Sequence, residues 1–130
     1  MNTKLVFTVT YILALVFGIG FVVLPAFILS LMGLQSSGQA PLLARGWGAF
    51  ILGVSALAFF SRNASRSDGR RAVLLALFAL YILLDLYTLS LNLFSGVPVN
   101  WMLALLYLVH TCLAVAYAYL LFGPPREIDA

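Results

Sequence analysis

The chain of 130 residues is 64% hydrophobic and 8% charged, and its net charge is +3. A soluble domain is about half apolar and a quarter charged, so the composition excludes a soluble globular protein and indicates that most of the chain faces lipid. The positive charge does not indicate nucleic-acid binding, because most basic residues gather in one loop, which membrane orientation explains more simply.

Four apolar segments are long enough to cross a membrane, since about 20 apolar residues span a hydrocarbon core of about 30 Å. The first segment is too long for the apolar region of a signal peptide and lacks a good cleavage site, so we expect a retained helix. Short loops make successive helices antiparallel neighbours, which predicts an all-α, four-helix transmembrane bundle in one domain over residues 1–130. The predicted helices cover residues 5–30, 42–60, 72–94 and 101–122.

Small residues are expected to mark the contacts between helices, because lipid provides no hydrophobic drive for helix association. Pro25 is also expected to kink the first helix near its outer end. The predicted packing faces contain Ala14, Gly18 and Pro25 in the first helix and Gly46, Ala49, Gly53 and Ala56 in the second. If the second face stayed exposed, it would suit a helix of another protein.

The loop between the second and third helices is rich in arginine, with Arg62, Arg66, Arg70 and Arg71. Lys and Arg accumulate in cytoplasmic loops, so this loop and both chain termini are predicted to be cytoplasmic. Arg45 is the one basic residue that this assignment places on the opposite side of the membrane. A second interpretation of the same loop is a docking site for anionic lipid or for a partner.

Asp85 lies in the middle of the apolar third segment. Ionisable residues inside a membrane are costly and often functional, which makes Asp85 the first candidate for a site. His110 lies at a similar depth, because each residue is nine positions from the outer end of its helix, or about 13 Å. The two helices are joined by a short turn, so a contact between these side chains is allowed.

Other polar residues share the helix faces of this pair. The third helix presents Tyr81, Asp85, Thr88 and Asn92; the fourth presents Tyr107, His110, Ala114 and Tyr117; and Arg45 lies near the outer end of the second. Together they would form a polar file from the outer face to mid-membrane, able to hold water, a small ligand or a proton path. The structural alternative is that burial keeps Asp85 protonated and that it forms a hydrogen bond with a Thr or Tyr. Such polar contacts between membrane helices commonly contribute about 0.6 kcal/mol each and need no function.

The sequence carries no catalytic or nucleotide-binding motif. A zinc site needs three or four ligands, and haem commonly needs a pair of axial ligands, whereas the chain has one histidine and one cysteine, Cys112. We therefore expect no metal, no cofactor and no catalytic activity.

One resemblance covers nearly the whole chain. Its segments are VLPAFILSLMGL at residues 23–34, LLARGWGAFILGVSALAFF at 42–60, RRAVLLALFALYILLD ending at Asp85, and LYLVHTCLAVAYAYLLF at 106–122. This order resembles small bacterial four-helix membrane proteins of the DoxX-like kind. The resemblance implies a bacterial inner-membrane location, places Arg45 at the arginine that heads the second helix, and carries over no catalytic residue. Some such proteins are regarded as partners of quinone-linked oxidoreductases.

The sequence favours a non-catalytic membrane component that binds a lipid, a quinone or a protein partner in the bilayer. The alternative is a small transporter or proton-linked channel that uses Asp85 and His110 as its relay. Four helices are few for a transporter, so this alternative requires a homo-oligomer. An intramembrane enzyme acting on a lipid is a third and less favoured interpretation.

Overall fold

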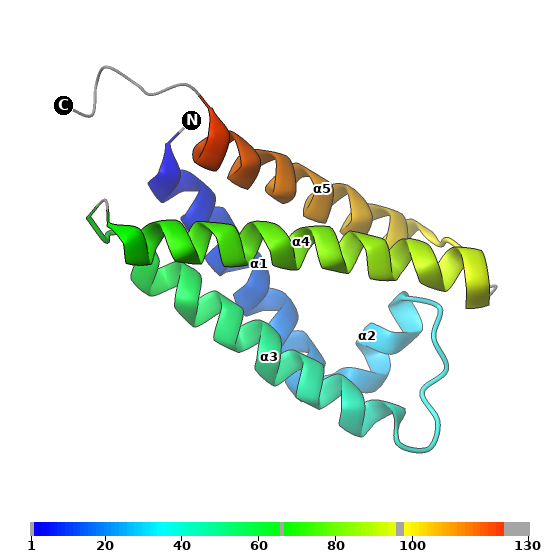
Figure 1. Ribbon diagram of the computed structural model, residues 1–130. Coiled ribbons are helices and arrows are strands. Elements are labelled where there is room, and N and C mark those ends of the chain that lie inside the picture. The colour runs from blue at the N-terminus through cyan, green and yellow to red at the C-terminus, as the bar shows by residue number, and fades with distance from the viewer. Residues whose placement is uncertain (1, 66, 96–97, 124–130) are drawn as a thin grey trace.

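The computed structural model describes residues 2–65, 67–95 and 98–123, which form five α-helices (Figure 1). The helices are α1 (Thr3–Val23), α2 (Pro25–Leu31), α3 (Ala40–Ser61), α4 (Asp68–Ser95) and α5 (Trp101–Phe122). The helices α1, α3 and α5, and α4 over Asp68–Ser90, are long and apolar enough to cross a membrane. The all-α bundle of four membrane helices is therefore confirmed, and these helices indicate a multi-pass membrane protein.

The first predicted helix is divided in two near its C-terminal end. The helix α1 ends at Val23, Leu24 leaves helical geometry with φ −125° and ψ 52°, and Pro25 starts α2. Proline has no N–H to donate and disfavours helical geometry in the residue before it. The position of the predicted kink at Pro25 is thus confirmed, but the single helix predicted over residues 5–30 is wrong, because the helix stops at Val23 and restarts in a new direction (Figure 1).

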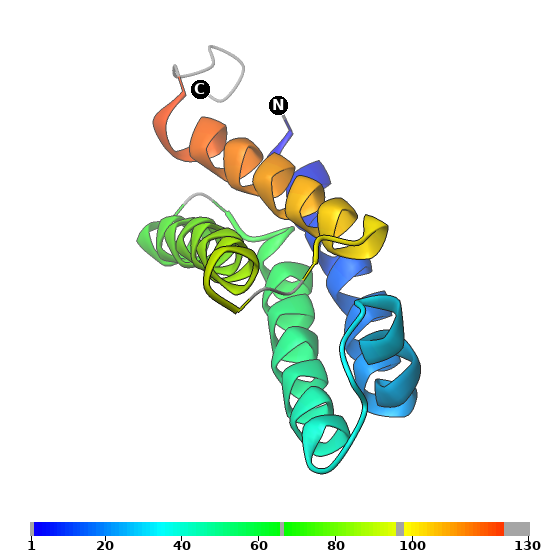
Figure 2. The same cartoon turned by 90° about the vertical axis from the view of Figure 1, so that its right-hand side faces the viewer.

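The helices pack in two pairs, α1 with α3 and α4 with α5, and the contacts between the pairs are far fewer. In Figure 2, α3 and the arm made of α1 and α2 run away from α4 and α5. The expectation that the second and third membrane helices pack as close neighbours is therefore only weakly met. Their short connecting loop ties together one end of α3 and α4, and it places no constraint on the other end.

The two ends of the molecule differ in charge. We call the end where α1 and α4 begin and where α3 and α5 finish the basic end; among the described residues it carries Lys4, Arg62, Arg70 and Arg71. We call the opposite end the α2 end. At the α2 end, the amide nitrogen of Asn100 donates to the Leu31 carbonyl at 2.9 Å, while its side-chain oxygen caps α5 by accepting from the Leu103 N–H.

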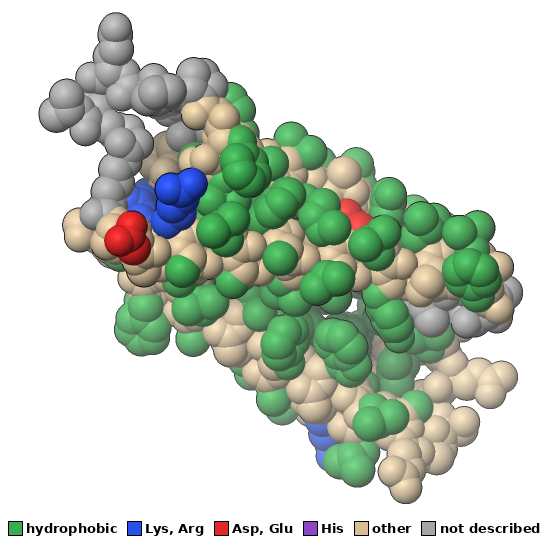
Figure 3. Space-filling view, in the orientation of Figure 1, with side chains coloured by type: hydrophobic (Ala, Val, Ile, Leu, Met, Phe, Trp, Pro, Cys, Tyr) green, Lys and Arg blue, Asp and Glu red, His purple; other side chains and the backbone are tan. Residues whose placement is uncertain are grey.

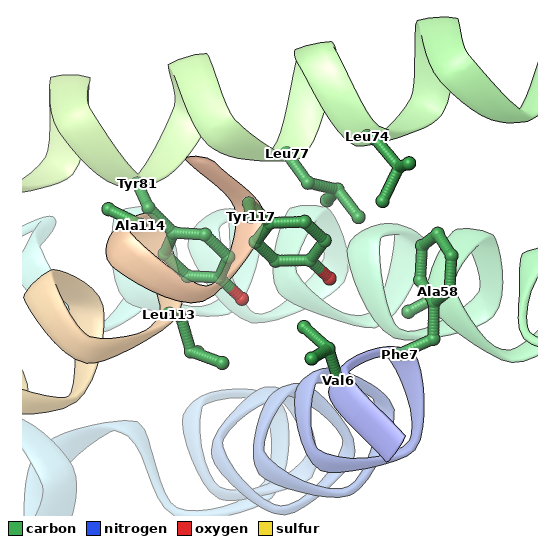
Figure 4. Close-up of a cluster of buried hydrophobic side chains, with 9 residues drawn as sticks. All are labelled: Val6, Phe7, Ala58, Leu74, Leu77, Tyr81, Leu113, Ala114 and Tyr117. Carbon is green, nitrogen blue, oxygen red and sulfur yellow. The ribbon is translucent and has the colours of Figure 1, made fainter. Parts of the chain in front are cut away.

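A cluster of packed side chains joins the two helix pairs at the basic end (Figure 4). At its centre Tyr117 is 0% exposed and shares a hydrogen bond of 2.8 Å with Thr10 of α1. The Tyr117 ring stacks on Tyr81 at 5.9 Å between centroids and meets Phe7 edge to face at 6.0 Å. Ala58 of α3 is also fully buried in the cluster, and its small side chain lets the helices approach closely.

Two glycines allow the close approach of α1 and α3. A Cβ atom at Gly48 would lie 2.8 Å from the Phe21 Cβ atom and 2.9 Å from the backbone oxygen of Gly18. A Cβ atom at Gly18 would lie 2.7 Å from a side-chain carbon of Leu52. Ala14, Gly18 and Pro25 are all buried, which confirms the packing face predicted for the first helix.

The prediction of which face of the second helix packs against its neighbour is wrong for the contact with α1. Its members, Gly46, Ala49, Gly53 and Ala56, are all exposed, whereas the buried small residues of α3 are Ala44, Gly48, Ser55, Ala58 and Ser61. The helix α3 has small residues on two faces, so composition did not show which face meets α1. The Ser55 hydroxyl, which donates to the Tyr11 carbonyl at 3.0 Å, lies on the face that does.

We predict that Gly48→Ala lowers the free energy of unfolding by about 1–3 kcal/mol, because the added methyl group forces the backbones of α1 and α3 apart. Gly46→Ala is the matched control, since a Cβ atom there meets nothing within 4 Å. Thermal unfolding in detergent, followed by circular dichroism, compares the two variants. Equal melting temperatures would contradict the proposed close contact.

Candidate functional site

A cleft of about 400 Å³ opens between the two helix pairs towards the α2 end. Figure 3 shows the molecule hollowed between α4 and α3 on this side. Most of the lining is apolar or aromatic and comes from all five helices, with Phe17, Leu29, Ile51, Leu84 and Leu103 as examples. The cleft exists because the pairs meet at the basic end and diverge from there.

A few polar and aromatic side chains interrupt this apolar lining. Tyr81, Thr88 and His110 line the cleft, and the rings of Tyr81 and His110 lie 5.6 Å apart. Trp47 of α3 and Tyr87 of α4 also line it and stack at 6.4 Å between ring centroids. This stacked pair is a contact between α3 and α4, so it bounds the cleft with aromatic surface.

The structure brings Asp85 and His110 together. The Nδ1 atom of His110 lies 3.6 Å from Oδ1 of Asp85, and the two side chains are 20% and 13% exposed, respectively. The other carboxyl oxygen of Asp85, Oδ2, accepts a hydrogen bond of 2.9 Å from the Thr111 hydroxyl. A separation of 3.6 Å is too long for a hydrogen bond. Within the described part of the chain, Asp85 Oδ1 and His110 Nδ1 are therefore buried polar atoms without a hydrogen-bond partner.

This arrangement places a carboxyl group beside one nitrogen of the imidazole ring. A hydrogen bond to one ring nitrogen of a histidine decides which nitrogen carries hydrogen, and at 3.6 Å Asp85 stands next to Nδ1 without forming that bond. Here the carboxyl group is itself positioned by Thr111. Because Nδ1 faces Asp85 and His110 lines the cleft, the second nitrogen, Nε2, is the one left for a bound molecule.

The remaining predicted site residues are distributed differently. Arg45 is exposed and Tyr107 is 43% exposed, and neither lines the cleft. Thr88 does line it, and its hydroxyl donates to the Leu84 carbonyl at 2.9 Å. The side chain of Asn92 lies outside the described residues.

The predicted polar file is therefore only partly assembled. Tyr81, Thr88 and His110 line the cleft and Asp85 lies beside His110, whereas Arg45 lies outside the cleft. Towards the basic end, ring contacts lead from His110 through Tyr81 to Tyr117, whose hydroxyl shares a hydrogen bond with Thr10. The predicted direction was inferred from depth along single helices. Only the packing of α1 against α5 shows where the polar side chains of different helices meet.

Sequence reasoning did not select Thr111, Trp47 or Tyr87 as site residues. Thr111 follows His110 directly, and a hydroxyl beside a membrane histidine is a signal that would have selected it. Trp47 lies towards the start of a membrane helix, where an aromatic residue is expected as an anchor at the membrane–water interface. No pattern along the chain shows that Trp47 and Tyr87 stack, because they belong to different helices.

The described residues contain no group of three or more His, Cys, Asp or Glu side chains that would hold a metal ion. Comparison of the chain with models of protein families, with curated proteins and with solved structures finds no match. The resemblance to DoxX-like proteins stays a prediction.

We predict that Asp85→Asn leaves the melting temperature nearly unchanged, because an amide oxygen can still accept from Thr111 and the amide nitrogen can donate towards His110. Thr111→Val, which removes the donor and keeps the shape, is expected to cost about 0.6 kcal/mol of unfolding free energy, and about 1.7 kcal/mol at most. Both are measured by thermal unfolding in detergent. A large loss of folded protein in Asp85→Asn alone would show instead that a charged carboxylate pairs with a protonated His110.

Proposed function

We propose that the protein is a non-catalytic component of the bacterial inner membrane that binds an apolar molecule with a polar head, a lipid or a quinone, in the cleft between its helix pairs. The observation that carries this proposal is the apolar cleft of about 400 Å³ with His110 on its wall. The described helices fill the bundle at one end only, which leaves a volume for a ligand inside the membrane.

The size and lining of the cleft suit such a ligand. Sites for small molecules commonly have volumes of about 300–1,000 Å³, with apolar walls and a small number of placed polar groups. The aliphatic lining would contact an acyl or isoprenoid tail. The faces of Trp47 and Tyr87 would contact a flat quinone ring or the first carbons of a lipid chain.

His110 is the group that would recognise the polar head. With Nδ1 turned to Asp85, its Nε2 atom can accept a hydrogen bond from a hydroxyl group, or donate one to a carbonyl when it carries hydrogen. Thr88 and Tyr81 line the same cleft. Asp85 stands behind the ring at Nδ1, and Thr111 holds the carboxyl group of Asp85 in place.

The charge difference between the two ends supports the proposed orientation. Lys4, Arg62, Arg70 and Arg71 lie at the basic end, which the rule for basic loops assigns to the cytoplasm together with both termini. The cleft then opens in the outer half of the bilayer. Its ligand would enter from lipid, through the gap between the diverging pairs.

A second candidate, a small oligomeric transporter or proton-linked channel, is favoured by the distance of 3.6 Å between His110 and Asp85 beside the cleft. The two groups would pass a proton between the cleft and the row of tyrosines that leads to the basic end. The exposed face with Gly46, Ala49, Gly53 and Ala56 is available to a second copy of the chain or to another membrane protein.

We predict that a short-tailed benzoquinone, or a lipid with a brominated chain, quenches Trp47 fluorescence in a saturable way. Trp101→Phe leaves Trp47 as the single tryptophan, because the chain contains two. Adding His110→Ala is expected to weaken binding about fivefold, the effect of losing one hydrogen bond of about 1 kcal/mol. Tyr107→Phe, outside the cleft on the same helix, is the control.

Quenching that rises linearly with quinone and lipid concentration, and that is equal for free tryptophan amide in the same micelles, would contradict a binding site. Saturation by the quinone alone or by the brominated lipid alone identifies the class of ligand.

For the second candidate, we expect liposomes containing the protein to conduct protons only if Asp85 and His110 form a relay. The flux is followed with a pH-sensitive dye after an imposed pH step. Asp85→Asn and His110→Ala would each abolish it, while Ser90→Ala on the same helix as Asp85 would not. A flux equal to that of empty liposomes in the unaltered protein would remove this candidate.

A further inference from the structure

A second cavity, of about 360 Å³, lies at the basic end and is separate from the cleft. It is formed where α1 begins, α4 begins and α5 ends, so it is assembled from the first and last parts of the bundle. Its polar lining includes the side chains of Arg70 and Arg71. Figure 3 shows basic side chains gathered over the start of α4.

The positive charge in this cavity is not neutralised by the described part of the chain. Among the described residues, neither Arg70 nor Arg71 forms an ion pair, and Nε of Arg70 is buried without a hydrogen-bond partner. Asp68 is in the first turn of α4 but is not among the residues that line the cavity. A buried guanidinium N–H without an acceptor is costly, so this atom favours the binding of an acceptor group in the cavity.

Hydroxyl groups stand beside the two arginines. The Ser67 Oγ atom accepts a hydrogen bond from the Arg70 backbone N–H at 3.2 Å, which leaves its own hydrogen to donate. Thr3, from the start of α1, adds a second hydroxyl group to the lining. The cavity thus combines two cations with hydroxyl donors, which is the donor set that a phosphate group requires.

The depth of the cavity matches the level of lipid head groups. Arg70 and Arg71 are the third and fourth residues of a membrane helix, so they lie about 3–5 Å from its start. Leu74 is one turn deeper on α4, and Leu120 faces the cavity from α5. The lining therefore changes from cationic at the surface to aliphatic further in, which parallels the change from head group to acyl chain in a phospholipid.

We propose that this cavity binds an anionic phospholipid, with its phosphate between Arg70 and Arg71 and the start of an acyl chain along Leu74 and Leu120. The planar guanidinium group offers paired N–H donors that fit two phosphate oxygens. The site does not depend on the ligand of the cleft, because the two cavities share no lining residue.

The test is titration of the delipidated full chain with dioleoylphosphatidylglycerol, with native mass spectrometry to count the bound lipid. Dioleoylphosphatidylcholine, which has a phosphate but no net charge, is the comparison lipid. The variants are Arg70→Gln with Arg71→Gln, and Arg70→Lys with Arg71→Lys, which keeps the charge and removes the fork. Arg45→Gln is the matched control, because it removes one charge at the other end.

We expect the unaltered protein to prefer the anionic lipid and the glutamine pair to weaken its binding about fivefold for each arginine. The affinity of the lysine pair should lie between those of the unaltered protein and the glutamine pair. Arg45→Gln should bind the lipid as the unaltered protein does. If the glutamine pair does not fold, as judged by circular dichroism, Arg71→Gln alone carries the test, since that side chain is exposed.

Three results would overturn the proposal. The first is unchanged lipid binding in the glutamine pair. The second is a loss of lipid affinity in Arg45→Gln that equals, for each charge removed, the loss in the glutamine pair. Such a result would show a general effect of net charge. The third is displacement of the lipid by millimolar inorganic phosphate, which would assign the cavity to free phosphate.

Discussion

The contact that joins the two helix pairs is centred on Tyr117, and the shape of the rest of the molecule follows from where this contact lies. Inside lipid there is no hydrophobic drive for helices to associate, so close packing and hydrogen bonds must hold them together. Tyr117 provides both, because its ring packs on Tyr81 and Phe7 and its hydroxyl shares a hydrogen bond with Thr10. This cluster is at the basic end. Away from this cluster the pairs diverge and leave the cleft, which Trp47 and Tyr87 line as a stacked pair between α3 and α4.

The divergence of the pairs also decides which polar groups a ligand can reach. Asp85 and Thr111 lie between α4 and α5, within one tightly packed pair. His110 belongs to the same pair but lines the cleft, so it connects the buried carboxyl group to the space between the pairs. A bound molecule would contact the imidazole ring, and the carboxyl group would act on that molecule through the ring. An imidazole on the wall of the cleft with a carboxyl group behind it suits binding of a polar head.

The two ends of the bundle have different chemistry. The basic end is packed and carries arginines whose charge meets no carboxylate among the described residues, whereas the α2 end is open and lined by apolar and aromatic groups. An anionic lipid at the first end would add contacts where α1, α4 and α5 meet. A ligand at the second end would fill the volume that packing leaves empty. Both proposed ligands would therefore stabilise the fold as well as serve its function.

Much of the architecture could be predicted from local properties of the sequence. The length and apolar character of the four segments determined the membrane helices, because lipid requires each segment to satisfy its own backbone hydrogen bonds. Pro25 determined the break after α1 by removing a donor, and the helix over residues 101–122 was predicted with the bounds that α5 has. The equal depth of Asp85 and His110 also followed from counting residues along neighbouring helices.

The tertiary structure alone decided which helix faces meet. The second membrane helix has small residues on two faces, and only the structure shows that Gly48 and Ser55 meet α1 while Gly46 and Gly53 remain exposed. Other features also depend on the tertiary structure alone. These are the contacts among the polar side chains, the position of Arg45 and Tyr107 outside the cleft, and the stacking of Trp47 on Tyr87. The physical reason is that spacing along a helix fixes which residues share a face, whereas the rotation of each helix about its axis is set by contacts with the others.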